Sequence, residues 1–61
     1  MENEIEILED RIARLEKSNA EYRERYGTGV RPAWVGEEIG INMMYIEIAK
    51  QQIAALKGEG Q

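Results

Sequence analysis

Two apolar seams with the same heptad spacing run through this chain, one on each side of a glycine-containing break. The first seam consists of Ile5, Leu8, Ile12, Leu15, Asn19, Tyr22 and Tyr26. The second consists of Val35, Ile39, Asn42, Ile46, Ala49, Ile53 and Leu56. Intervals that alternate between three and four residues place all members of a seam on one narrow stripe of an α-helix, as in a coiled coil. The pattern therefore predicts two long helices that pack along these stripes.

The two seams match position by position when the chain is folded back on itself. Residue i then lies opposite residue 61 − i, so Ile5 faces Leu56 and the only polar members, Asn19 and Asn42, face each other. A polar pair inside such a seam commonly fixes the register at some cost in stability. The sequence leaves open whether the two asparagines bond directly or are partly solvated. We predict an all-α fold, an antiparallel two-helix hairpin in this register.

Capping residues mark the ends of both predicted helices. Asn3, followed by Glu6 three residues later, is typical of a helix start, and Gly27 and Gly58 are natural C-terminal caps. These signals divide a single domain, residues 1–61, into helix one at about 3–26, a loop at 27–33, helix two at about 34–57 and a frayed tail at 58–61.

The start of helix two and the role of its glycines have two interpretations each. Proline is well tolerated in a first helical turn, so Pro32 can begin the helix, but Gly36 can begin it as well. Gly36 and Gly40 lie one turn apart, and glycine inside a helix costs up to about 1 kcal/mol relative to alanine. The pair indicates either a close approach of another backbone or ligand, or an N-cap followed by a local bend.

Helix two carries a second apolar stripe, flanked by Met43, that helix one cannot cover in the same hairpin. The residues of this stripe that we assign to an oligomer interface are Ile41, Met44, Tyr45, Ile48, Gln52 and Ala55. An apolar stripe left in water marks an interface, and a chain this short is marginally stable alone. We therefore expect a homo-oligomer with helix two inside. A dimer that forms a four-helix bundle is the simplest closure, and trimers or higher rings remain open.

The composition removes several kinds of chemistry. The 61 residues include no Cys and no His, which excludes disulfides, the common zinc and haem ligand sets, and imidazole or thiol catalysis. We expect a protein that is not an enzyme and holds no metal and no cofactor. The formal net charge of −4 argues against binding of long nucleic acids, which requires a broad basic face. The acidic first residues and the lack of a long apolar run favour a cytoplasmic protein that binds no membrane.

The break between the helices gathers the residues best suited to bind a ligand. We predict as ligand-binding residues Arg23, Arg25, Tyr26, Gly27, Thr28, Gly29, Arg31 and Trp34. Guanidinium groups donate forked hydrogen bonds to phosphate, a helix N-terminus attracts anions, and aromatic rings stack on bases. These properties together suit a phosphorylated or cyclic nucleotide. The alternative is a plain turn, in which the aromatic rings cap the bundle and the arginines pair with nearby acids.

The chain resembles small phage-encoded helical-hairpin proteins in its size, its hairpin, and its cluster of Tyr26 and Trp34 with neighbouring arginines. Some proteins of that group assemble into oligomers and sequester the cyclic nucleotide signals of bacterial immunity, using Arg and aromatic residues at subunit boundaries. The resemblance implies an anti-defence sponge that binds its ligand without turnover. Our expectation is a non-enzymatic, oligomeric nucleotide-binding hairpin. The alternative is a coiled-coil oligomerisation or protein-interaction module without a small ligand.

Overall fold

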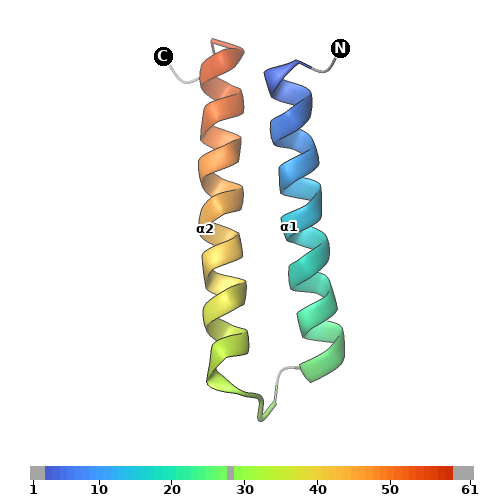
Figure 1. The fold of residues 1–61 in the computed structure, drawn as a ribbon. Coiled ribbons are helices and arrows are strands. Elements are labelled where there is room, and N and C mark those ends of the chain that lie inside the picture. The colour runs from blue at the N-terminus through green and yellow to red at the C-terminus, as the bar shows by residue number, and fades with distance from the viewer. Residues whose placement is uncertain (1–2, 28, 59–61) are drawn as a thin grey trace.

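The computed structural model describes residues 3–27 and 29–58, which form two α-helices packed side by side (Figure 1). Helix α1 spans Glu4–Tyr26 and helix α2 spans Ala33–Leu56. The helices are antiparallel: the end of α1 lies beside the start of α2, and the start of α1 lies beside the end of α2. The described residues contain no strand. The predicted all-α class and the packing of one helix against the other are therefore confirmed.

Helix α1 is capped at both ends by the residues that the sequence indicates. The side-chain oxygen of Asn3 accepts a 2.8 Å hydrogen bond from the backbone N–H of Glu6. At the other end, Gly27 adopts a positive φ of 66° and its N–H donates to the carbonyl oxygen of Arg23 at 2.8 Å. Glycine reaches this backbone region without the steric penalty of a side chain, which is why α1 stops here.

Helix α2 begins at Ala33, directly after Pro32 and not near Gly36. It ends at Leu56, with Lys57 as its C-cap and Gly58 at a φ of 77°. No side chain caps its N-terminus. Two peptide N–H groups at the first turn of α2, those of Ala33 and Trp34, therefore have no partner supplied by a capping side chain.

The buried residues of the hairpin all belong to the two seams. They are Leu8, Asn19, Val35, Ile39, Asn42, Ile46 and Ala49. Most of the other seam members are half-buried, but Leu56 at the open end is 47 % exposed. The core is thus one stripe wide, and it is tightest in the middle and toward the connected end of the hairpin.

Asn19 and Asn42 bond directly across the centre of the seam. The side-chain nitrogen of Asn42 donates to the side-chain oxygen of Asn19 at 2.9 Å, and the side-chain nitrogen of Asn19 donates to the carbonyl oxygen of Ile39 at 3.3 Å. Asn42 also donates to the hydroxyl of Ser18 at 3.4 Å. A buried amide left without a partner costs about 1–3 kcal/mol, so this network favours the one register in which both asparagines are satisfied. The register predicted from the seams is confirmed at this pair.

The hairpin is a single layer of helices, measuring 42 × 27 × 13 Å. Its smallest dimension is close to the diameter of one helix with its side chains, about 10–12 Å. Stable domains usually bury their apolar faces between two layers, so this arrangement leaves the outer sides of both helices without a covering layer. No helix in the described part of the chain is long and apolar enough to cross a membrane.

Candidate functional site

The apolar stripe on α2 lies on the surface of the hairpin, away from α1. The exposed fractions of its large side chains are 43 % for Ile41, 52 % for Met44, 50 % for Tyr45 and 42 % for Ile48. Its remaining members, Gln52 and Ala55, are also exposed. We call these six residues the outer face of α2. The helical period of 3.6 residues centres them about a third of a turn around the helix from the buried seam, too far for α1 to cover them all.

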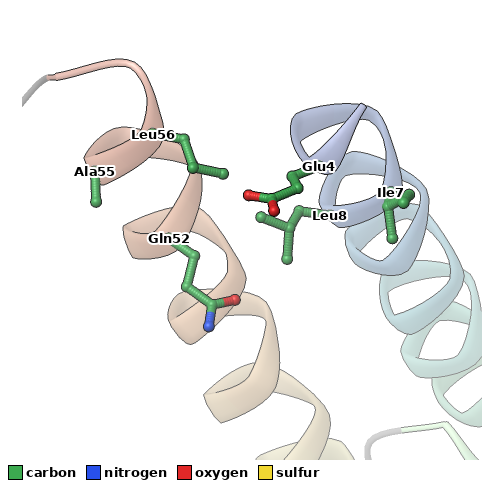
Figure 2. Close-up of a pocket in the computed structure, with 6 residues that line it drawn as sticks. All are labelled: Glu4, Ile7, Leu8, Gln52, Ala55 and Leu56. Carbon is green, nitrogen blue, oxygen red and sulfur yellow. The ribbon is translucent and has the colours of Figure 1, made fainter. Parts of the chain in front are cut away.

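The outer face continues onto α1 at the open end of the hairpin. A groove of ≈ 450 Å³ opens there between the two helices, lined by Glu4, Ile7, Leu8, Gln52, Ala55 and Leu56. Leu8, Leu56 and the carboxylate of Glu4 point toward one another across the groove (Figure 2). Ile7 is 45 % exposed. The groove therefore connects the last residues of the outer face, Gln52 and Ala55, to the apolar side chains of Ile7 and Leu8 on α1.

Ile7 lies in this groove but does not belong to the interface that the sequence predicts. It lies one residue before Leu8 and outside the heptad seam, among charged neighbours. An isolated apolar residue next to a seam is weak evidence for an interface, because single exposed apolar residues are common on protein surfaces. The structure is what links Ile7 to the outer face, because the exposed Leu56 and the outer-face residues Gln52 and Ala55 lie across the groove from it.

At the connected end, Trp34 packs against two tyrosines of α1. Its ring centroid lies 5.9 Å from that of Tyr22 and 5.9 Å from that of Tyr26, with interplanar angles of 82° and 80°. Edge-to-face pairs of this kind contribute about 0.5–1.5 kcal/mol each beyond the area that they bury. Trp34 remains 48 % exposed. The tryptophan therefore fixes the start of α2 against the end of α1 and still presents part of its ring to water.

Arg31 crosses the gap between the two helix ends. One of its terminal nitrogens, Nη1, donates to the carbonyl oxygen of Gly27 at 3.2 Å, and the side chain is partly buried. The other, Nη2, lies 3.9 Å from the position that a Cβ atom on Gly36 would occupy. The guanidinium thus lies between the end of α1 and the first turns of α2, next to the N-terminus that no side chain caps.

The other two arginines of the predicted ligand site lie on different sides of α1. Arg23 lines a groove with Met43 and Lys50 of α2, whereas Arg25 lies beside Glu21 and Glu24 of its own helix. Residues two positions apart on a helix point about 200° apart, so this separation follows from the spacing itself. The hairpin alone does not bring Arg23, Arg25 and Arg31 together.

The plain-turn alternative also differs from the structure in its ion pairs. Within residues 3–27 and 29–58 the one ion pair joins Arg14 to Asp10 at 2.8 Å, and Arg23 and Arg25 take no part in it. Gly29 lies in the exposed connection, where a side chain at its position would meet nothing within 4 Å. Thr28, which we also predicted to bind a ligand, lies outside the described residues.

No group of three or more acidic, histidine or cysteine residues that could hold a metal ion occurs in the part of the chain that the structure describes.

Comparisons with family models, with curated proteins and with solved structures found no match to this chain.

Proposed function

We propose that the protein is a non-enzymatic helical-hairpin module that self-associates through the outer face of α2. The observation that carries the proposal is the exposure of Ile41, Met44, Tyr45 and Ile48 side by side on one helix of a single-layer fold. Contiguous apolar patches of this kind on small proteins mark interaction sites. The chain also lacks the His and Cys side chains on which most acid–base and nucleophilic catalysis depends.

The energetics of the outer face favour association. Complete burial of a large aliphatic or methionine side chain gains about 1.5–3 kcal/mol, so a side chain that is already half-buried can still gain roughly 1 kcal/mol. Three such side chains, Ile41, Met44 and Ile48, lie on the outer face of each copy, together with the aromatic ring of Tyr45. Chains near this length commonly depend on oligomerisation for a sufficient core. A second layer of helices on α2 would supply that core.

The test is the molecular mass in solution of Ile48→Asp beside the unchanged protein, by sedimentation velocity over a range of concentrations. We expect the unchanged protein to be oligomeric and Ile48→Asp to sediment as a monomer, because the new carboxylate would be desolvated at the interface. Ala13→Asp, which places the same charge at an exposed position on α1, is the matched control and should remain oligomeric. A monomeric unchanged protein at all concentrations would refute the proposal.

A second candidate function is the binding of a phosphorylated ligand, such as a cyclic or linear nucleotide, at the connected end. The specific observation in its favour is the position of Arg31 beside the uncapped N-terminus of α2, with the half-exposed ring of Trp34 on the same turn. Backbone N–H groups at a helix start and a guanidinium both bind phosphate oxygens, and an exposed indole ring can stack on a base. Arg23 and Arg25 could add to this site only from different sides of the hairpin.

Thermal-shift measurements with nucleotides, including cyclic dinucleotides and oligonucleotides, test this candidate. A ligand at about 100 times its Kd stabilises the folded state by about 2.7 kcal/mol, which in a domain of this size raises the melting temperature by more than about 10 °C. The shift should disappear in Arg31→Ala and persist in Arg11→Ala, a control that removes an exposed arginine of α1. If no nucleotide shifts the melting temperature of the folded protein, the connected end serves only to join the helices.

A further inference from the structure

The exposed side of α2 carries a second heptad seam beside the buried one. Its members are Glu38, Ile41, Tyr45, Ile48, Gln52 and Ala55, and all are exposed. The intervals alternate between three and four residues, as they do in the seam that α1 covers. We call these six residues the outer seam. The same spacing on the buried side is satisfied by an antiparallel helix, so the outer seam has the geometry to accept another helix in the same way.

We infer that the outer seam packs against the outer seam of a second copy of this chain, antiparallel, about a two-fold axis that passes between Tyr45 and Ile48. The inference rests on the proposed self-association and specifies its partner and geometry. In this register Tyr45 lies against the partner's Ile48 and Ile41 lies against the partner's Gln52. A two-fold axis makes each of these contacts occur twice, which is the economical arrangement for a homodimer.

Charge distinguishes the antiparallel arrangement from a parallel one. A parallel seam would place Glu38 against the partner's Glu38, with the two copies of Glu37 close by. Like charges at the same position along two neighbouring helices repel each other. In the antiparallel seam these acids lie instead near the partner's Lys57, which follows the C-terminal end of α2. The dipoles of the two helices also run in opposite directions in this arrangement.

Charge selects the register as well. In the register shifted by one heptad, Glu38 would lie opposite the partner's Ile48 and no longer opposite the partner's Ala55. Its carboxylate would then lie inside the contact and lose its hydration. In the inferred register Glu38 lies at the end of the seam, opposite the small side chain of the partner's Ala55, and its carboxylate can reach water. Trp34 falls beyond the contact and keeps its packing against Tyr22 and Tyr26.

The register can be tested by chemical crosslinking, because the chain contains no cysteine of its own. The double variant Ile41→Cys/Gln52→Cys places thiols at two positions that the inferred register brings together between copies. The positions lie about 16 Å apart along one helix, from a rise of about 1.5 Å per residue, and a bis-maleimide reagent shorter than this cannot join them within one chain. We expect covalent dimers from the double variant and none from either single variant.

The matched control is Met43→Cys/Ala54→Cys, which has the same eleven-residue spacing on the opposite side of α2 and should give no covalent dimer. The mass of each untreated variant in solution is measured in parallel. A covalent dimer from either single variant would indicate a parallel seam or a different antiparallel register, and either would overturn the inference while self-association stands. A protein that is dimeric without crosslinking at these sites would likewise overturn it, and a protein that is monomeric at every concentration would overturn both proposals.

Discussion

The buried and exposed sides of α2 use the same kinds of residue in the same spacing, yet they end in opposite environments. Ile39 and Ile46 on the buried side are 7 % and 9 % exposed, whereas Ile41 and Ile48, each two residues further along, are 43 % and 42 % exposed. The chain supplies a partner helix for one side only. The hairpin therefore buries one apolar side of α2 and leaves a second apolar side exposed to water.

The largest effect expected from this comparison comes from placing a charge in the buried seam. Ile46→Asp would bury a carboxylate without a partner, a change that costs roughly 3–5 kcal/mol. A domain of this size has little more stability than that, so we expect Ile46→Asp to lose its helical circular dichroism at any concentration. Ile48→Asp should lose association, with any loss of helix arising through that step. A folded Ile46→Asp variant would contradict the assignment of the core.

The asparagine pair should have an effect of intermediate size. Asn19→Ala removes the acceptor of the 2.9 Å bond from Asn42 and leaves one N–H of that buried amide without its partner, while the longer bond to Ser18 remains. We therefore expect a loss of about 1–3 kcal/mol in the free energy of unfolding measured with urea. The double variant Asn19→Leu/Asn42→Leu removes both polar groups and should recover most of that loss. If the double variant is as unstable as Asn19→Ala, the cost lies in the shape of the site and not in its hydrogen bonds.

The smallest effect is expected at Gly40, which lies outside both the buried seam and the outer face of α2. A Cβ atom on Gly40 would meet nothing within 4 Å, so the hairpin itself gives no reason for this glycine. Gly40→Ala should therefore raise the free energy of unfolding by up to about 1 kcal/mol through its higher helix propensity. The measurement is again urea unfolding, together with sedimentation. A variant that is less stable and more weakly associated would indicate that a neighbouring backbone approaches this side of α2.

Much of the fold could be predicted because helical periodicity is a local property. A residue's position in a 3.6-residue repeat decides which side of the helix it occupies, so the spacing of apolar residues alone separates the buried seam from the outer face. The single polar position in each seam then indicates the register, and the structure has Asn19 and Asn42 bonded there. The same periodicity also separates Arg23 from Arg25, although our prediction assigned both arginines to a single ligand site.

The connected end and the groove at the open end could not be predicted in the same way. The position of Arg31 depends on backbone angles in the connection and on the carbonyl group of Gly27, which is available because α1 ends at Tyr26. The two tyrosines around Trp34 come from another helix, and the exposure of Leu56 depends on how closely the helix ends approach each other. No short repeat in the sequence encodes these distances.

The two helices, their antiparallel register and an apolar face that α1 does not cover all follow from residue spacing along a helix, so they could be predicted from the amino-acid sequence. Three features depend on the packed structure: the direct bond between Asn19 and Asn42, the aromatic contacts at the connected end, and the continuation of the outer face into a groove beside Ile7. These features depend on distances between side chains of different helices, which are set only when the helices pack.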